Sequence, residues 1–386
     1  MVQFSKVKQL LHWGPLLALF IIAFVTAWAV LCTFVWWPPA LDDVGSILHM
    51  VMLFVWLFLI LYNFFKAAFI GPGFVPLGWK PDNPEECKYL QYCKICKGYK
   101  APRSHHCRKC GRCVMKMDHH CPWINTCCGH TNHTRFIYFL FFAPAGCIHG
   151  SVIFILTIYN QLYKNRYLYH AIASKAWLTF TVYSFLLTFF ALGMAIGVTL
   201  SVGFLFVTQV RSIWKNETGI ETWIIEKADR PREDEFVYPY NLGWKRNLKE
   251  IFTLEGLPSG DGITWPVVDG CNQYTLTVEQ LVQKEEKRNR TMELTAFENY
   301  SGYVFPITKG FYTCISVPCT DEPRIPLTKG DKILVTRWKK YWLYGDKVID
   351  QEGEGQIRIR GWFPRRCAKE VFNNGMNLVV EEKKDM

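Results

Sequence analysis

Four long hydrophobic runs without a charged side chain dominate the pattern along this chain. They cover residues 13–41, 44–65, 136–163 and 176–210. A helix that crosses a bilayer needs about 20 apolar residues, and each run is long enough. Helices in the core of a soluble protein rarely extend so far without a charge, so the pattern predicts four transmembrane helices rather than four buried core helices. The first run is too long for a signal peptide, and no small-residue cleavage site follows it.

Polar segments separate these runs and continue after the last one. Residues 1–70 hold the first two spans, 71–135 form a cysteine-rich module bounded by Gly and Pro, and 136–210 hold the other two spans. The third span is expected to begin near Phe136, which sets the module against the membrane face. The tail has ordinary soluble composition and divides into 211–290 with a predicted helix over 278–287, a β-rich part over 291–372, and a final stretch over 373–386.

Short alternating runs characterise the β-rich part of the tail. They occupy residues 332–336, 341–344 and 356–360, and turn residues such as Lys329-Gly330-Asp331 bound them. This pattern predicts a small all-β barrel rather than an irregular tail.

Basic residues set the expected orientation in the membrane. Ten Lys and Arg side chains lie between residues 83 and 135, whereas the loop over 164–175 has three and the loop after the first span has none. Short loops rich in Lys and Arg stay in the cytosol, so we expect the cysteine-rich module and both termini to be cytosolic. The formal net charge of +11 suits contact with anionic lipid headgroups, and it also suits an anionic ligand.

Cysteine is concentrated in the second polar segment. Of fifteen cysteines, eight lie between Cys93 and Cys128. Cytosolic thiols stay reduced, so a disulfide framework is not expected. Paired Cys-x-x-Cys units with intervening histidines are typical of closed tetrahedral zinc sites. The segment has more cysteines and histidines than the eight ligands that two such sites need, and the spacing does not say which are spare.

Asp118-His119-x-Cys121 places a carboxylate, an imidazole and a thiol within four positions. An imidazole can hold a nearby cysteine as a thiolate, and a carboxylate can orient that imidazole. The pattern therefore makes Cys121 a candidate nucleophile. The alternative is that Cys121 is itself a zinc ligand.

The segment resembles the DHHC cysteine-rich domain of protein S-acyltransferases, also called palmitoyltransferases. The resemblance rests on Cys93-x-x-Cys96, Pro102-Arg103, His106-Cys107, Cys110, Cys113, Asp118 to Trp123, Cys127, Asn132 and Phe136. It implies two interleaved structural Zn²⁺ sites, with Cys121 free to act and His119 and Asp118 supporting it. The implied ligands are Cys93, Cys96, His106 and Cys113 in one site, and Cys107, Cys110, His120 and Cys127 in the other.

Two motifs after the fourth span extend this resemblance. Thr218-Gly219-Ile220-Glu221 is similar to the family's Thr-Thr-x-Glu motif, with Gly219 in place of the second Thr. Arg246-Asn247 leading to Ile251-Phe252 is similar to the family's aromatic-flanked C-terminal motif. The candidate substrate-binding residues are Trp123, Arg103, Arg135, Thr218, Glu221 and Asn247.

The tail carries a second resemblance. Ala296 to Tyr300, Leu327, Gly330-Asp331, Trp342 and Gly361 to Pro364 resemble a variant SH3 domain. A DHHC domain with such a tail is similar to the endoplasmic-reticulum member of the family. Lys383 and Lys384, at the end of a tail expected in the cytosol, resemble a dilysine retrieval signal for that compartment. Cys314, Cys319 and Cys367 are candidate acylation sites, with inert thiols as the alternative.

The fold expected is therefore an α-helical polytopic membrane protein with a cytosolic zinc-binding domain and an SH3-like small β-barrel. The expected function is transfer of a long-chain acyl group from palmitoyl-CoA, through an acyl-enzyme on Cys121, to cysteines of membrane or peripheral proteins. Glycines such as Gly146, Gly150, Gly193 and Gly197 would give the acyl chain room or serve helix packing. The alternatives are a zinc-stabilised scaffold that recruits partners through its tail, a nucleic-acid-binding zinc finger and a RING-type ligase. The membrane spans disfavour nucleic acid as a partner.

Overall fold

The structure is a computed structural model that divides into two compact units. It describes residues 8–36, 44–167, 180–229, 236–253, 256–320, 322–351 and 355–370. One unit covers Met1–Leu281 and the other covers Val282–Met386, so the division falls within one helix.

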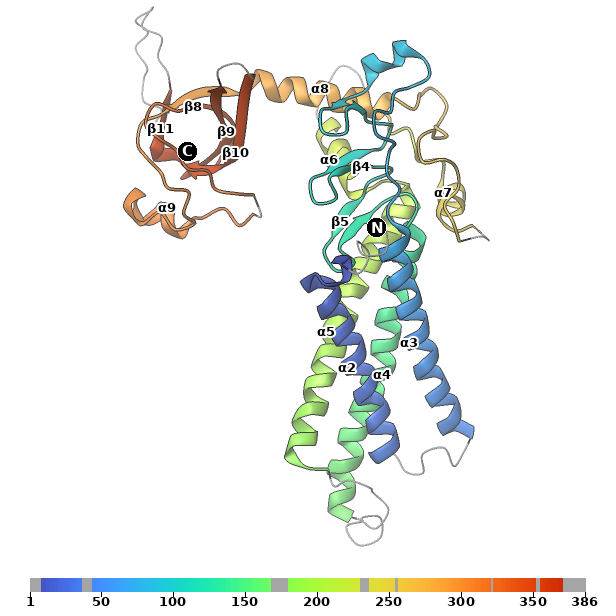
Figure 1. Cartoon of the computed structure of the whole chain (residues 1–386). Coiled ribbons are helices and arrows are strands. Elements are labelled where there is room, and N and C mark those ends of the chain that lie inside the picture. Colours follow the sequence, from blue (N-terminus) through green and yellow to red (C-terminus); the bar gives the residue numbers. More distant parts are fainter. Residues whose placement is uncertain are drawn as a thin grey trace, which may run out of the picture. The chain divides into compact units, whose positions relative to one another are not determined.

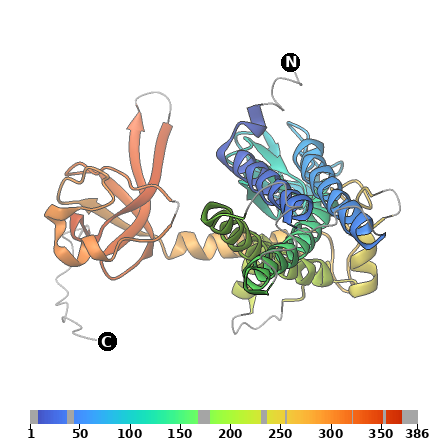
Figure 2. The same ribbon diagram turned by 90° about the horizontal axis from the view of Figure 1, so that it is seen from below.

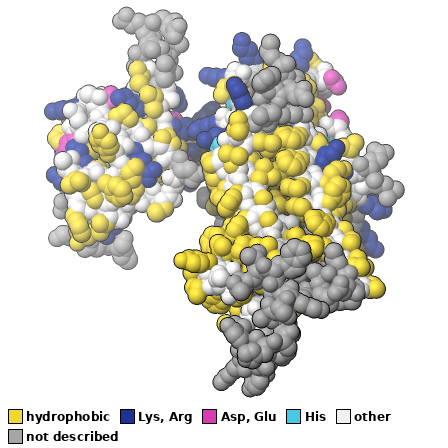
Figure 3. All heavy atoms as spheres, turned by 60° about the horizontal axis from the view of Figure 1, so that its bottom comes forward, with side chains coloured by type: hydrophobic (Ala, Val, Ile, Leu, Met, Phe, Trp, Pro, Cys, Tyr) yellow, Lys and Arg dark blue, Asp and Glu magenta, His cyan; other side chains and the backbone are white. Residues whose placement is uncertain are grey.

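Four long helices form an up-and-down bundle in the first unit (Figures 1 and 2). Their outer faces are apolar, with Leu200 and Phe204 about 70% exposed (69% and 72%). Figure 3 shows hydrophobic side chains gathered over the bundle. Helices that are apolar all round belong in a membrane, so the predicted four spans are confirmed. The third begins at His133, three residues before the expected start. The helices are α2 (Trp13–Trp36), α3 (Val44–Ile70), α4 (His133–Tyr167) and α5 (Val182–Lys215).

Short hairpins make up the cysteine-rich domain at one end of the bundle (Figure 1). Their turns contain residues with positive φ, such as Gly111 (68°) and Asn125 (47°). Hairpins of two or three residues per strand have little stability of their own, so side chains must hold them together. The domain contains η1 (Pro84–Tyr89) and the pairs β1 (Tyr92–Cys93) with β2 (Gly98–Tyr99), β3 (His105–Cys107) with β4 (Arg112–Val114), and β5 (His119–Cys121) with β6 (Thr126–Cys128).

Three further helices follow the bundle in the described part of the chain, and the last of them crosses from the first unit into the second. Ile224 on the first of them packs with Tyr240, Trp265 and Leu276 in one apolar cluster. The last of the three contains the helix predicted over 278–287, and that prediction is confirmed. These helices are α6 (Gly219–Ala228), α7 (Trp244–Ile251) and α8 (Thr275–Asn289).

An antiparallel sheet of five strands forms the second unit, in the order β10-β9-β8-β7-β11. Its core includes Trp342, Phe363 and Ile333, none of which is exposed to solvent. The three predicted strand regions fall in β8, β9 and β10 and are confirmed, whereas an SH3 fold stays a prediction. The elements are β7 (Met292–Ala296), η2 (Ile307–Lys309), α9 (Phe311–Ile315), β8 (Lys332–Trp338), β9 (Trp342–Gln351), β10 (Gly355–Pro364), η3 (Arg365–Cys367) and β11 (Ala368–Glu370).

Candidate active site

Two groups of three cysteines and one histidine lie among the hairpins. The three Sγ atoms of the first group lie 3.5, 3.5 and 3.8 Å from His106 Nδ1. Those of the second group lie 3.6, 3.4 and 3.7 Å from His120 Nδ1. Tetrahedral zinc with its usual bond lengths separates sulfur from nitrogen by about 3.6 Å, so both groups fit zinc. The groups are Cys93, Cys96, His106 and Cys113, and Cys107, Cys110, His120 and Cys127.

The middle hairpin, β3–β4, supplies donors to both groups. His106 and Cys107 are neighbours in one strand, and successive side chains of a strand point to opposite faces. One therefore enters the first group and the other enters the second. In β5–β6, His120 and Cys127 are paired across the strands, which brings both into the second group. These interleaved groups are the same two sets that the family resemblance implied.

Cys121 belongs to neither group, although it follows His120 directly. The alternation along β5 turns its side chain away from the metal donors and toward the helix bundle. There it packs in an apolar cluster with Ile124 and Phe136, and it is only 2% exposed. This geometry argues against Cys121 as a zinc ligand, the alternative that its sequence pattern left open.

Asp118 is held by three hydrogen bonds, two of which come from distant parts of the chain. His119 Nδ1 and Gln209 Nε2 donate to its Oδ2 at 2.7 and 2.8 Å. The backbone N–H of Gly219, at the start of α6, donates to Oδ1 at 2.6 Å. The Gln209 amide is fixed in turn, because its carbonyl oxygen lies 3.0 Å from His133 Nε2. The carboxylate is therefore positioned before any substrate binds, and it fixes the His119 ring.

These contacts shift the ionisation of the site. Although burial opposes ionisation, hydrogen bonds from His119 and the Gly219 backbone hold the pKa of Asp118 well below its usual range. Burial also opposes a charge on His119, but the contacts with Asp118 and Cys121 raise its pKa to about 10. A hydrogen bond from Cys128 and then the contact with His119 lower the pKa of Cys121 to about 5. The environment thus favours a thiolate beside an imidazolium.

The segment before α2 holds the loop that follows Cys121. Gln9 Nε2 donates to the carbonyl oxygens of Ala68 and Ile124, both at 2.9 Å, and the Gln9 carbonyl accepts from Asn125 Nδ2 at 3.0 Å. A Cβ atom on Gly14 would lie only 2.0 Å from the carbonyl oxygen of Pro122, so only glycine fits here. The start of the first span is therefore in direct backbone contact with the loop.

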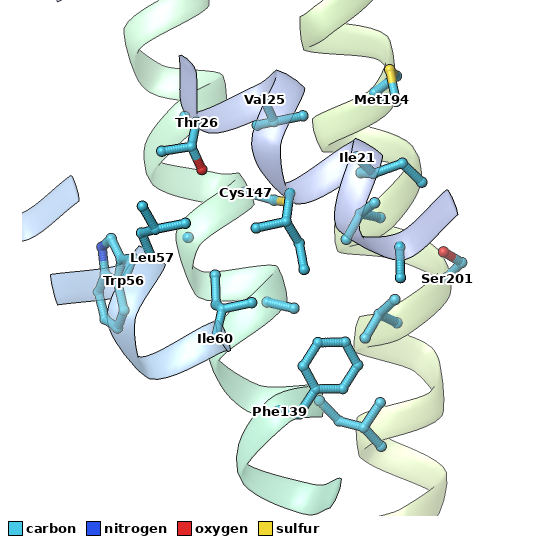
Figure 4. Close-up of a pocket in the computed structure, with 18 of the residues that line it drawn as sticks. Ile21, Val25, Thr26, Trp56, Leu57, Ile60, Phe139, Cys147, Met194 and Ser201 are labelled. Atoms are coloured by element: carbon cyan, nitrogen blue, oxygen red, sulfur yellow. The ribbon is translucent and has the colours of Figure 1, made fainter. Parts of the chain in front are cut away.

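A cavity of about 430 Å³ extends from Cys121 into the bundle. All four helices line it, and almost all the lining side chains are apolar (Figure 4). Gly146, Gly150 and Gly197 are among the lining residues, whereas Gly193 is not. Cys121 and Trp123 lie at the end next to the cysteine-rich domain, and Ala29 and Gly150 lie further along their helices. A thiolate that opens into a long apolar cavity is suited to receive a fatty acyl chain.

Comparisons with known proteins agree with this chemistry. The family model for the DHHC palmitoyltransferase matches residues 86–226. "Palmitoyltransferase ZDHHC6" of Danio rerio is 49% identical over 98% of this chain and 96% of its own length. The chain belongs to the DHHC palmitoyltransferase family. The protein of the same name from Homo sapiens is 50% identical over 95% of this chain, and "Probable protein S-acyltransferase 16" of Arabidopsis thaliana is 32% identical over 50% of it.

The protein is thus an enzyme, a protein S-palmitoyltransferase, and the scaffold, nucleic-acid and RING alternatives are set aside.

In this palmitoyltransferase Arg103 is fully buried. Its Nε and Nη2 donate to the two carboxylate oxygens of Glu221 at 2.8 and 2.7 Å. The guanidinium also stacks on Tyr240, at 4.4 Å from the ring centroid. This burial argues against the expected role of Arg103 and Glu221 in substrate binding, because both charges are already paired inside the protein.

Thr218 and Asn247 also have structural partners. The Thr218 hydroxyl caps α6 by accepting from the Glu221 backbone N–H, and the Glu221 carboxylate accepts from the Thr218 backbone N–H, which completes a capping box. Asn247 Nδ2 donates to the Trp214 carbonyl oxygen at 2.7 Å and so binds the end of α5. Thr218 therefore fixes the start of α6, whose first N–H group contacts Asp118, and Asn247 fixes the end of α5.

Trp123 and Arg135 are the predicted substrate-binding residues that stay accessible. Trp123 is 39% exposed and lines the cavity, with its ring edge-to-face against Trp13 at 5.6 Å. The Arg135 guanidinium is partly buried and lies 5.4 Å from the centre of the Tyr62 ring.

The candidate acylation sites in the tail differ in exposure. Cys367 lies in the core of the sheet and is not exposed, so a folded domain does not present it to a donor. Cys314 is half-buried, and Cys319 is exposed. Lys383 and Lys384 lie outside the described residues.

Sequence reasoning missed the residues that support the site from a distance. Gln209 holds the Asp118 carboxylate and is itself held by His133, Cys128 donates to Cys121, and Gln9 holds the following loop. The only sequence signal for Gln209 is its position as a polar residue in the last part of a hydrophobic run, and such residues often mark functional sites. The others have no local pattern that separates them from ordinary polar residues.

Proposed function

We propose that Cys121 is the nucleophile of this palmitoyltransferase, that His119 is its general base and acid, and that Asp118 orients His119. One observation carries the proposal: the Cys121 thiol stands outside both metal-donor groups and opens into the apolar cavity. The hydrogen bond of 2.7 Å between Asp118 and His119 supports the roles proposed for these two residues.

The proposed reaction has two thioester exchanges. In the first, the Cys121 thiolate attacks the carbonyl carbon of palmitoyl-CoA, and the bond from that carbon to the CoA sulfur breaks. His119 gives the proton it holds to the leaving CoA sulfur. In the second, His119 takes the proton of a substrate cysteine, the new thiolate attacks the acyl-enzyme, and Cys121 leaves as a thiolate. The proton stays on His119, which restores the starting state.

The two Cys/His groups are proposed to hold structural Zn²⁺ ions. When bound, zinc would hold the hairpins together, and its four protein ligands would leave no position for water. The role of these residues is thus to keep Cys121 fixed between the domain and the membrane.

The cavity is proposed to bind the acyl chain. Each methylene transferred from water into such a site contributes about 0.8 kcal/mol. An apolar cavity of about 430 Å³ therefore gives a long chain a large advantage over a short one. Trp123 at its entrance and Arg135 on the membrane face remain candidates for contact with the donor.

Labelling of purified enzyme with radioactive palmitoyl-CoA tests the nucleophile. We expect a hydroxylamine-sensitive label on the native chain and its loss in Cys121→Ser. Cys147→Ser is the matched control, because Cys147 is the other thiol that lines the cavity. Label that persists in Cys121→Ser and disappears in Cys147→Ser would assign the acyl group to the wrong sulfur and refute the proposal.

We propose the endoplasmic-reticulum membrane as the location, with both termini cytosolic. The basic loop between the second and third spans and Lys383-Lys384 support this. The SH3-like tail is proposed to bind partner proteins, and Cys319 is the most exposed of the three candidate acylation sites. Replacing both terminal lysines with alanine is expected to release the enzyme to later compartments, which microscopy of the tagged full chain would measure.

A further inference from the structure

The C-terminal unit exposes an apolar segment between β7 and β8, which we call the apolar loop, residues 303–315. It includes η2 and α9. Six large apolar or aromatic side chains of this short segment are more than 60% exposed within the described part of the chain, and soluble domains rarely expose so many together. They are Tyr303 (73%), Phe305 (67%), Ile307 (83%), Phe311 (73%), Tyr312 (62%) and Ile315 (62%).

This exposure is built into the fold, because the inner side of the loop is anchored in the sheet. Thr313 is buried, and its carbonyl oxygen accepts a hydrogen bond from Trp342 Nε1 at 3.0 Å. Tyr312 stacks on Tyr341, with ring centroids 5.8 Å apart and an angle of 11° between the rings. The loop is thus held in a conformation that turns the other side chains outward.

Positive charge lies beside the apolar loop, near Tyr341, on which Tyr312 stacks. Lys340 lies over the Tyr341 ring at 5.6 Å, and the Arg365 backbone N–H donates to the Tyr341 carbonyl oxygen at 2.9 Å. Lys339, Lys340 and Arg365 are exposed, and none forms an ion pair among the described residues. The nearby carboxylate of Glu298 is already paired with Lys309 at 2.8 Å. Figure 3 shows Lys and Arg side chains next to hydrophobic ones on this unit.

We propose that the apolar loop inserts into the headgroup region of the bilayer that holds the enzyme, with Lys339, Lys340 and Arg365 binding anionic lipid. Exposed aromatic and aliphatic side chains beside unpaired basic ones are the pattern of surfaces that lie in a membrane interface. The unit is also joined by its own chain to a membrane-embedded enzyme, so the bilayer is present at high effective concentration. A second copy or a protein partner would bury the apolar side chains, but it gives no reason for the three basic side chains beside them.

Photo-crosslinking in the full-length enzyme tests this. Benzoylphenylalanine replaces Phe311, and the enzyme is placed in nanodiscs of phosphatidylcholine with or without phosphatidylserine. We expect lipid adducts by intact mass, several-fold more than with the same probe at Ile359, which is 42% exposed on β10 outside the loop. Anionic lipid should increase the yield, and each of Lys339→Gln and Lys340→Gln should lower that increase about fivefold.

The other outcomes refute docking on lipid. Adducts only to another protein chain would identify a protein interface, whether with a second copy or a partner. A lipid yield no higher than that at Ile359 would show that the loop stays in water. A second probe position at Phe305 (67% exposed) repeats the test if the Phe311 variant does not fold. Acyl-enzyme formation on Cys121, measured in the same samples, reports whether the enzyme itself is intact.

Discussion

A bulkier side chain at Gly150 should shorten the acyl chain that the enzyme accepts. Gly150 lines the cavity on α4, fourteen residues after Phe136, which packs with Cys121. At 1.5 Å per residue this separation is about 21 Å along the helix, so Gly150 is far from the reacting sulfur. A Cβ at this position would lie 3.6 Å from Val25 Cγ1, an ordinary contact, so the helices tolerate a side chain that then extends into the cavity.

The size of the effect follows from the methylenes that the side chain displaces. Leucine adds about four carbon atoms and excludes a similar number of methylenes from the far part of the cavity. At about 0.8 kcal/mol each, palmitoyl-CoA loses about 3 kcal/mol of binding. A donor shorter by that number of carbons loses nothing. The preference between the two donors should therefore change by about two orders of magnitude toward the shorter one.

Competition between acyl-CoAs measures this change directly. Purified Gly150→Leu is mixed with equal amounts of donors of different lengths, and the acyl-enzyme is resolved by intact mass. Gly193→Leu is the matched control, since Gly193 does not line the cavity and a Cβ there meets no atom within 4 Å. If Gly150→Leu loads normally with an unchanged chain profile, the cavity is not the acyl site and the reasoning is wrong.

Two further predictions concern the support of the site. Arg103→Ala should destabilise the enzyme by about 3–5 kcal/mol, because it leaves the Glu221 charge buried and unpaired. Replacing both charged side chains should cost less, and thermal unfolding in detergent compares the single and double variants. An equal loss of stability in the two variants would refute this coupling. Gly14→Ala should reduce acyl-enzyme formation, because the new Cβ atom would collide with the Pro122 backbone. Gly203→Ala should not, because a Cβ atom there has no neighbour within 4 Å. Equal acyl-enzyme formation in both variants would show that the loop after Cys121 tolerates displacement.

The four spans and the metal donors could be predicted from the sequence because their signals are local. A run without charges is hydrophobic whatever surrounds it, and a Cys-x-x-Cys unit brings two sulfurs together within one turn. The sequence alone did not separate ligand from spare residue. Whether a residue is a metal ligand depends on the direction in which its side chain points, as for the neighbours His120 and Cys121. The pairing of β5 with β6 decided those directions.

Tertiary structure also decided what surrounds the charges. Arg103 and Arg135 are both basic residues of one polar segment, and nothing local marks the first for burial. Glu221, its partner, is 118 residues away, and Asp118 binds Gln209, 91 residues away. Such contacts exist only once α5 and α6 pack on the cysteine-rich domain. The sequence by itself determined the membrane spans, the pool of cysteines and histidines that can bind metal, and the candidate nucleophile, because each residue carries its own chemistry and hydrophobicity. Position, burial, ionisation and the choice of metal ligands depend on neighbours that only the fold supplies.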